Sequence, residues 1–184
     1  TMNLYLLRHG LAAERDQQKF PDDSLRPLVL KGEERIGLAC AALETLELSF
    51  DWILSSPYLR ASQTAEIVAA KLGLRKRLKL CDELACGGDP KALIRYVYQL
   101  RPGPENVLLV GHEPDLSQVI SLLISGGPAV AIDMKKGGLA KLVMRVRNIA
   151  EGAALMSETK VTSRVFSAVS NLVGNRPLSE AMQA

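Results

Sequence analysis

The sequence predicts an α/β protein with a mostly parallel sheet that helices cover on both faces. First, apolar runs of strand length alternate with segments of helical periodicity. Second, the run at 107–110 is apolar throughout, as in strands that are buried on both faces. Third, 184 residues with 47% hydrophobic and 23% charged side chains are typical of one globular domain, so a single domain is expected over 1–184.

The first half of the chain contains five expected elements. They are strands at 3–7, 52–54 and 78–81 and helices at 31–46 and 58–72. The helix at 58–72 has the clearest pattern, since small and apolar residues recur at steps of four, three and four from Ala61 to Leu72. Ser56 is expected to cap this helix, Pro57 to fit its first turn and Gly73 to end it.

The second half continues the alternation. A helix is expected to start at Asp89 and Pro90 and to run to about 100, and a strand follows at 107–110. A further helix ends at Gly126, and 139–147 is expected to form an edge strand. Apolar residues with helical spacing also predict a helix at 161–173. Three roles remain open for residues 148–184: covering the site, extending the sheet or mediating contacts.

Composition and charge exclude several classes of protein. The net charge of +3 is too small to favour nucleic-acid binding, and the basic run from Arg75 to Lys79 fits a solvated strand edge. No apolar run is long enough for a membrane helix, and the first residues lack the pattern of a secretory signal. Three cysteines without a CxxC pair argue against a disulfide framework, so a cytoplasmic location is expected.

The two histidines of the sequence have matching surroundings. His9 directly follows the first strand, and His112 follows the strand at 107–110. In a parallel α/β sheet both side chains emerge at the carboxyl ends of their strands, where such sheets bind ligands. One such histidine alone is more often structural than chemical. Two histidines at equivalent strand ends favour a shared site.

Three arginines accompany the histidines. Arg8 adjoins His9, Arg60 lies in the first turn of the helix at 58–72, and Arg26 lies in the Pro-flanked loop after the first strand. A helix N-terminus with an arginine nearby suits an anion, and the guanidinium group matches phosphate oxygens. Taken singly, Arg60 and Arg26 would more commonly be surface residues.

Other kinds of chemistry lack their usual motifs. The string His112-Glu113-Pro114 is not HExxH, and two histidines without paired cysteines do not favour a zinc site. The chain has no GxSxG nucleophile elbow and no glycine-rich nucleotide loop. What remains is a metal-free phosphate site. Histidine can serve there as a covalent nucleophile, and cationic side chains can stabilise the transferring phosphoryl group.

The sequence resembles the histidine phosphatase superfamily, also called the phosphoglycerate mutase-like family. The triplet Arg8-His9-Gly10 after the first strand, the block at 55–66 (SSPYLRASQTAE) and the block at 110–117 (VGHEPDLS) occur in the family's order and spacing. The resemblance covers roughly residues 2–138. The motif RHGLA, the Arg-Pro-Leu context of Arg26 and the short connection DELACGGDP are most similar to the SixA-type phosphohistidine phosphatases.

The resemblance implies a fold, an activity and site residues. The fold would be a three-layer α/β/α sandwich, and catalysis would need no metal or other cofactor. His9 would be the nucleophile that becomes phosphorylated, while Arg8, Arg60 and His112 would bind the phosphoryl group with Arg26 as a further ligand. Two departures stand out. Val29 replaces a Thr or Ser found in many members, and the segment after about 141 does not follow the family pattern.

The general acid is the least defined role. Glu83 lies in the loop where the superfamily often places an acid, but an ordinary loop carboxylate would fit equally well. Asp82 and Glu113 are weaker candidates. The substrate decides how much an acid matters. A phosphomonoester leaves as an alkoxide and needs a proton, whereas protonated phosphohistidine leaves as imidazole, so the SixA-type branch can work with a poor acid.

Three functions remain in competition. The favoured one is a phosphohistidine phosphatase that acts on a protein partner, such as a phosphotransfer domain, because a short chain leaves the site open. The second is a phosphatase for a small phosphorylated metabolite, which would need extra loops to grip its substrate. The third is a non-catalytic phosphate-binding module, which would not require a pair of imidazoles. A mutase is disfavoured because nothing in the sequence resembles a lid.

Overall fold

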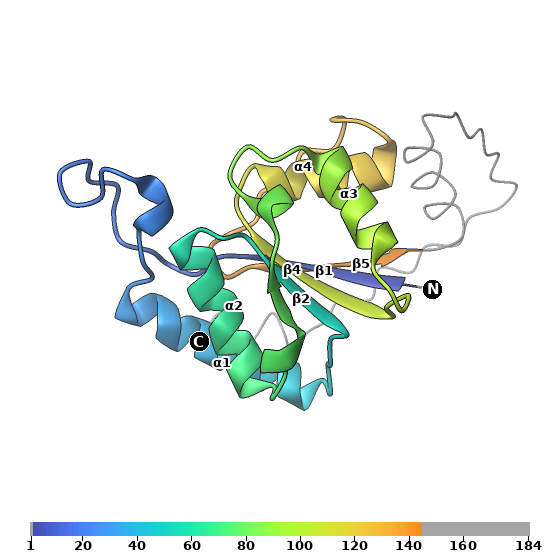
Figure 1. Ribbon diagram of the computed structural model, residues 1–184, viewed down its shortest axis with the longest axis horizontal. Helices are drawn as coiled ribbons and strands as arrows, with labels where there is room; N and C mark the ends of the chain where they lie inside the picture. The colour runs from blue at the N-terminus through green and yellow to red at the C-terminus, as the bar shows by residue number, and fades with distance from the viewer. Residues whose placement is uncertain (1, 145–184) are drawn as a thin grey trace, which may run out of the picture.

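The described part of the chain contains a central sheet of five strands in the order β3-β2-β4-β1-β5 (Figure 1). The structure is a computed structural model that describes residues 2–144. The strands are β1 (Met2–Arg8), β2 (Trp52–Ser55), β3 (Leu78–Leu80), β4 (Asn106–Gly111) and β5 (Leu139–Met144). The pairs β1–β4, β2–β4 and β2–β3 are parallel, and β5 lies antiparallel to β1 at the edge. The expected mostly parallel sheet is confirmed, and so is the edge strand over residues 139–144; residues 145–147 of the expected strand lie outside the described residues.

Four α-helices cover the two faces of the sheet. They are α1 (Leu30–Thr45), α2 (Leu59–Lys71), α3 (Pro90–Gln99) and α4 (Asp115–Ser125). Helices α1 and α2 lie on one face, and α3 and α4 lie on the other (Figure 1). Short 3-10 helices form at η1 (Asp23–Leu25), η2 (Arg75–Arg77) and η3 (Asp82–Leu84). The three-layer α/β/α sandwich is therefore confirmed. The single-domain prediction for 1–184 and the helix expected at 161–173 extend beyond the described residues.

Each central strand contributes to two separate hydrophobic clusters. In β1, Leu4 and Leu6 pack toward α3 and α4, whereas Tyr5 and Leu7 pack toward α1 and α2. Strand β4 alternates in the same way between its odd-numbered and even-numbered residues. Successive side chains of a strand point to opposite faces, so a strand covered by helices on both sides is apolar throughout. This is why the run at 107–110 has no polar residue.

The ends of the helices follow the sequence signals with one exception. Asp89 caps α3 by accepting hydrogen bonds from Lys91 N and Ala92 N, and Gly126 closes α4 with φ 74°. The expectation for Ser56 as the cap of α2 and Pro57 in its first turn was wrong, because α2 begins only at Leu59. Ser56 Oγ accepts a hydrogen bond from Tyr58 N ahead of the helix. Its hydroxyl also meets His112, as described below.

Pairing of β1 with β4 brings the two histidines to one edge of the sheet. Arg8 and Gly111 are register partners at the carboxyl ends of these strands, so His9 and His112 follow at the same level. The backbone N–H of His9 donates to Gly111 O at 3.0 Å and extends this pairing by one bond. At the other end of the strands, Asn3 Nδ2 donates to Asn106 Oδ1 at 2.8 Å.

The basic run lies at the edge of the sheet, as expected. It lies in η2 and β3, and β3 is an edge strand, as the solvated-edge interpretation requires. Arg77 donates from Nη1 to Phe50 O at 2.7 Å. The three cysteines are free. Within residues 2–144, no helix combines the length and the apolar character needed to cross a membrane.

Candidate active site

His9 and His112 lie side by side at the carboxyl end of the sheet. Their ring centroids are 5.2 Å apart, and the ring planes are inclined by 55°. Both residues are buried, with 5% and 2% of their surface exposed. The two rings are close enough for one phosphoryl group to contact both. The structure thus brings together residues that 102 positions of sequence separate.

The backbone fixes the tautomer of His9. Its Nδ1 atom lies 2.7 Å from the carbonyl oxygen of Gly10, which can only accept a hydrogen bond. Nδ1 therefore carries the proton, and the lone pair of the neutral ring is on Nε2. Burial lowers the pKa of His9 to about 4, and the charges of Arg60, Arg8 and Lys136 act in the same direction against the hydrogen bond to Gly10. At neutral pH the ring is an uncharged nucleophile.

His112 is held by Ser56 on the neighbouring strand. The distance from His112 Nε2 to Ser56 Oγ is 2.8 Å, and the Tyr58 ring lies 5.1 Å from the imidazole. Burial lowers the pKa of His112 to about 3, helped by the charge of Arg60. A neutral ring that accepts the Ser56 hydroxyl hydrogen at Nε2 carries its own proton on Nδ1. His112 Nδ1 is buried and has no hydrogen-bond partner, so this N–H can donate to a ligand.

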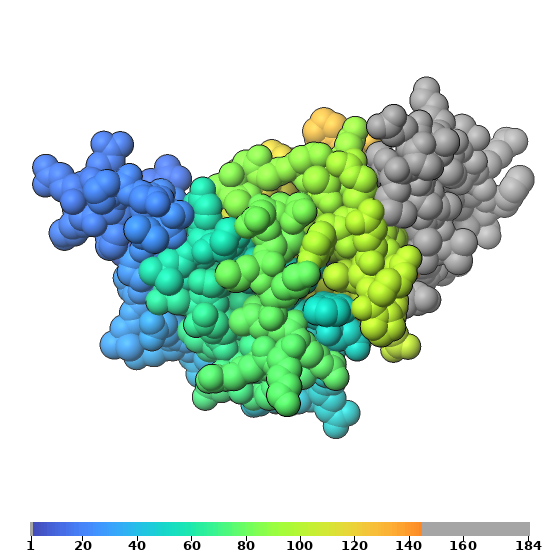
Figure 2. Space-filling view, viewed as in Figure 1, coloured from blue at the N-terminus to red at the C-terminus, as the bar shows by residue number. Residues whose placement is uncertain are grey.

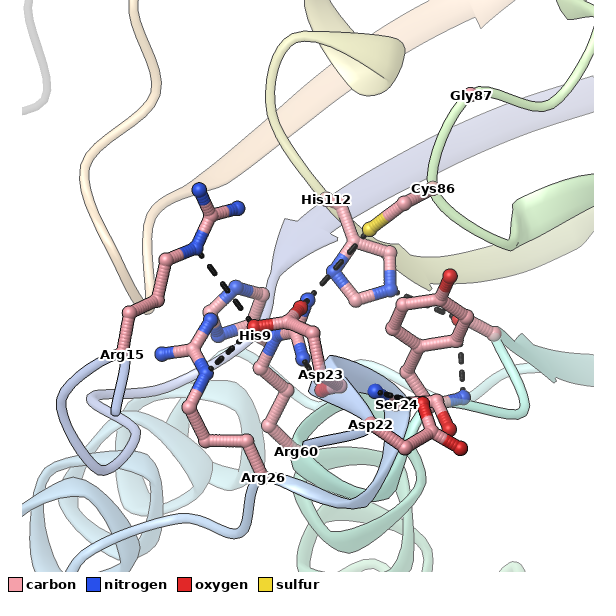
Figure 3. Close-up of polar contacts among 12 residues, drawn as sticks. His9, Arg15, Asp22, Asp23, Ser24, Arg26, Arg60, Cys86, Gly87 and His112 are labelled. Atoms are coloured by element: carbon pink, nitrogen blue, oxygen red, sulfur yellow. Dashed lines mark hydrogen bonds and ion pairs between the residues drawn. The ribbon is translucent and has the colours of Figure 1, made fainter. Parts of the chain in front are cut away.

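Arg60 is the most deeply buried cation of the site, with 2% of its surface exposed. Its Nη1 donates to Asp23 O at 2.7 Å, and its Nη2 pairs with Asp23 Oδ2 at 2.9 Å (Figure 3). Arg26 is also buried and donates to Asp23 Oδ1 and Ala13 O. Arg8 donates from Nη1 to Met134 O in the loop that precedes β5. The structure thus gathers all three predicted arginines around the histidines.

Three nitrogen donors at the site are buried and have no partner among the described residues. They are Arg8 Nε, Arg60 Nε and His112 Nδ1. A buried N–H group without a partner costs free energy, so such groups mark a place where a ligand supplies the acceptor. Two of the three belong to cations. An anion with several acceptor oxygens, such as a phosphoryl group, fits this set of donors.

The segment after β1 is held against α2 by small residues. Gly10 N donates to Thr64 Oγ1 at 3.1 Å, and the Thr64 hydroxyl donates to Arg60 O at 2.7 Å. A Cβ atom on Gly10 would lie 3.0 Å from Ile36 Cγ1. A side chain at position 10 would require the side chains of Ile36 and Leu28 to give way. This close approach explains why glycine follows the histidine.

Within residues 2–144, the carboxylates predicted as general acids form no hydrogen bond or ion pair with the histidines or arginines of the site. Glu83 Oε2 accepts a hydrogen bond from the Cys81 thiol at 3.1 Å. Asp82 is exposed in η3. Glu113 accepts from Ser117 through Oε2, and its Oε1 is buried without a partner. Glu83 thus stays a prediction as the acid, and so do Asp82 and Glu113.

Two residues of the site were not predicted to take part in it. Asp23 contacts two of the predicted arginines, and Ser56 contacts His112. The signal for Asp23 was its place three residues before Arg26, a spacing that allows a local ion pair. Residues 2–144 contain no group of three or more His, Cys, Asp or Glu that could hold a metal ion.

Comparison with known proteins places this geometry in a family. Residues 4–85 match the family model of the histidine phosphatase superfamily, branch 1. The chain is 31% identical over 126 residues to the phosphohistidine phosphatase SixA of Escherichia coli, which covers 68% of this chain and 76% of that protein. The chain belongs to the histidine phosphatase superfamily, which confirms the resemblance of its motifs and supports phosphatase activity.

SixA-type proteins are among the relatives and solved structures that this chain is similar to. A solved structure of the protein histidine phosphatase SixA with tungstate superposes with a TM-score of 0.69 at 26% identity and covers 80% of this chain and 91% of that one. An uncharacterized protein of Picosynechococcus is 38% identical over 77% of this chain and 84% of its own length. A putative α-ribazole-5'-P phosphatase of Escherichia coli shares the fold, with a TM-score of 0.62 at 23% identity, over 80% of this chain and 93% of that one.

Proposed function

We propose that this protein is a metal-independent phosphatase that forms a phosphohistidine on His9 and acts on phosphohistidine carried by a protein partner. One observation supports the mechanism above all others. His9 is a neutral imidazole with its lone pair on Nε2, and three unpartnered N–H donors lie on the residues around it. A nucleophile next to donors for an anion is what phosphoryl transfer requires.

The first step transfers the phosphoryl group to His9. The Nε2 lone pair attacks phosphorus in line with the leaving group, and a new N–P bond forms as the bond to the leaving group breaks. Negative charge spreads over the three phosphoryl oxygens. Arg8 Nε–H, Arg60 Nε–H and His112 Nδ1–H are the donors that stabilise this charge.

The second step releases phosphate. Water attacks phosphorus from the side that the leaving group has vacated, and the electrons of the N–P bond return to His9 Nε2. The hydrogen bond from Nδ1–H to Gly10 O holds the ring in the same tautomer throughout. The Nε2 lone pair that attacks phosphorus in the first step is therefore restored when the N–P bond breaks in the second.

The proposed substrate class rests on similarity and on two short connections near the site. The SixA proteins of Escherichia coli and Haemophilus influenzae bear the name phosphohistidine phosphatase or its homologue, and the chain is 31% and 30% identical to them. The connections between β3 and α3 and between β4 and α4 are short, so neither adds a subdomain over the site. A protein-borne imidazole needs such an open approach.

A small phosphorylated metabolite is the second candidate substrate. The observation that favours it is the shared fold of the putative α-ribazole-5'-P phosphatase. In that case the same histidines and arginines would carry the reaction, and only the group that binds beyond the phosphoryl site would differ.

The deciding experiment measures phosphate release from a phosphohistidine-bearing phosphotransfer domain and from p-nitrophenyl phosphate, both with EDTA present. We expect fast release from the protein substrate and slow release from the ester. The reverse preference would favour a small-molecule phosphatase. A strict metal requirement would contradict the mechanism, and binding of phosphate without turnover of either substrate would indicate a non-catalytic module.

A further inference from the structure

Asp23 is the only carboxylate among the described residues that forms ion pairs with the predicted phosphate-binding arginines. Its Oδ1 lies 3.0 Å from Arg26 Nε and 3.6 Å from Arg15 Nε, and its Oδ2 lies 2.9 Å from Arg60 Nη2 (Figure 3). The arginine atoms it occupies are not the unpartnered Nε groups of Arg8 and Arg60. Asp23 therefore adds a negative charge to the site and leaves the donors for the phosphoryl group free.

Asp23 lies at the border between the buried site and solvent. Its side chain is 39% exposed, between that of Arg60 at 2% and that of Arg15 at 83%. It comes from the segment between β1 and α1, which projects from one end of the molecule (blue in Figure 2). A leaving group that departs in line, on the side away from His9, must pass toward solvent. The Asp23 carboxylate pairs with the buried Arg60 and with the exposed Arg15, so it lies between the arginine cluster and solvent.

The carboxylate of Asp23 stays charged and acts on imidazoles nearby. Burial would raise the pKa of Asp23, but the hydrogen bond from Arg26 and the charges of three arginines outweigh it and hold the pKa below its usual value. Asp23 is therefore unsuited to donate a proton at neutral pH. The charge of Asp23 acts on the pKa of His112 in the direction opposite to burial and to the charge of Arg60.

Phosphohistidine departs most readily when its ring is protonated. In the reaction, Nε2 of His9 forms a bond to phosphorus, the P–N bond of the substrate breaks, and the leaving ring keeps that electron pair. If the other ring nitrogen already carries a proton, the product is neutral imidazole and no acid is needed at the moment of transfer. A fixed negative charge near the ring stabilises this cationic substrate. The same charge repels a leaving group that departs as an anion.

We propose that Asp23 determines the leaving-group preference of the site, favouring a protonated imidazole over leaving groups that become anionic. The inference rests on the proposed function, because it concerns the same phosphoryl site. The proposal also explains how the site can work without a general acid. Glu83 accepts a hydrogen bond from Cys81, and among the described residues no carboxylic acid contacts the histidines.

The experiment compares two small substrates, so that recognition of a protein partner does not contribute. Phosphoimidazole releases imidazole, and p-nitrophenyl phosphate releases a phenolate. kcat/KM is measured for both at pH 7 in wild type and in Asp23→Asn, which keeps an oxygen acceptor for the arginines and removes the charge. Asp22→Asn is the matched control, because it removes the same charge from a carboxylate that hydrogen-bonds with Ser24 and forms no ion pair with the arginines of the site.

We expect Asp23→Asn to lower the ratio of the two kcat/KM values, phosphoimidazole over ester, about tenfold, the effect of one unit charge across a few ångströms of partly solvated protein. Asp22→Asn should leave the ratio unchanged, and Asp23→Glu should restore most of it. If Asp23→Asn is not folded by circular dichroism, Asp23→Ser replaces it.

Two outcomes would overturn the inference alone. Equal loss on both substrates would mean that Asp23 only positions Arg60, and an unchanged ratio would mean that its charge does not reach the leaving group. Wild type that hydrolyses the ester but not phosphoimidazole would instead overturn the proposed function. Because wild type is measured first, failure of the proposed function can be told apart from failure of the inference about Asp23.

Discussion

Among single residues, the partner of Nδ1 distinguishes the two histidines. In His9 this atom meets a carbonyl oxygen, and in His112 it has no partner. The first arrangement exposes a lone pair on Nε2, and the second leaves an N–H group for an acceptor. Two residues of the same type thus acquire opposite roles, nucleophile and donor, from their backbone and hydroxyl neighbours.

Replacing the nucleophile tests the mechanism directly. His9→Ala should lower turnover of any substrate by at least about a thousandfold, because no other described group supplies a lone pair at that position. The backbone bond from residue 9 to Gly111 O persists in the variant, so the fold should be retained. Phosphate release and far-ultraviolet circular dichroism measure the two effects. Normal activity in a folded variant would exclude His9 as the nucleophile.

Glu83 can be tested through the chemistry of the leaving group. Glu83→Gln keeps an acceptor for the Cys81 thiol and removes the titratable proton. We expect hydrolysis of an alkyl phosphate, whose alkoxide leaving group needs a proton, to slow several-fold, with a smaller effect on phosphohistidine, because imidazole leaves without a strong acid. Rates on both substrates provide the comparison. Equal slowing would remove Glu83 from the list of leaving-group acids.

The sequence permitted prediction of those site residues that follow a strand or begin a helix. His9, His112, Arg8 and Arg60 lie at such positions, and the structure gathers them. Asp23 and Ser56 could not be recognised, because a loop aspartate and a serine before a helix have common structural roles as turn and cap residues. Apart from the local pair of Asp23 with Arg26, their contacts are with Arg60 and His112, which lie far away in the chain, so only the folded structure reveals them.

At the level of elements, the contact between α1 and the segment after His9 depends on glycine. A Cβ atom on Gly32 would overlap Leu11 O, whereas one on Gly37, five residues along the same helix, would meet nothing within 4 Å. Both glycines lie in a helix, where alanine is the better helix former. Alanine at Gly37 therefore tests helix propensity alone, whereas alanine at Gly32 also tests the packing of α1 against Leu11.

This pair of glycines gives a matched prediction for stability. Gly37→Ala should raise the free energy of unfolding by about 0.5–1 kcal/mol, the difference in helix propensity. Gly32→Ala should lower it by about 2 kcal/mol or more, because α1 or the backbone of Leu11 must move. Urea unfolding of both variants measures the changes. Stabilisation by Gly32→Ala would contradict the packing described here.

Elements were predictable where local signals and burial agreed. Helix α3 begins at its expected cap, and α4 ends at its expected glycine. The start of α2 was misplaced, because Ser56 and Pro57 carry signals of a helix start while the backbone there still follows the end of β2. Ser56 N donates to Val110 O, a bond to the neighbouring strand that sequence periodicity does not reveal.

For the whole molecule, the two buried histidines link stability to pH. Their pKa values fall from 6.5 to about 4 and about 3, chiefly by burial. Between pH 6.5 and 5 the unfolded chain binds protons that the folded chain excludes, so stability decreases as the pH falls. The limiting slope is about 1.4 kcal/mol per pH unit for each histidine.

Urea unfolding at pH 7, 6 and 5 measures this loss. The free energy of unfolding should fall steadily over that range, and His9→Ala should reduce the slope by about half, because one of the two titrating rings is gone. The lowest pH of this series lies above the pH range in which protonation of Asp23, whose pKa is lowered, would change the free energy of unfolding. Stability that is constant from pH 7 to 5 would contradict burial of neutral rings.

The pairing of β1 with β4 divides the site between two parts of the chain. Residues 101–105 connect α3 to β4 and are largely exposed. A cut in this loop would leave His9, Arg8 and Arg60 on one fragment and His112 on the other. Neither fragment would hold a complete site, and docking of β4 between β1 and β2 would restore it. Phosphatase activity would then act as a complementation signal, reporting the reunion of two separately expressed halves.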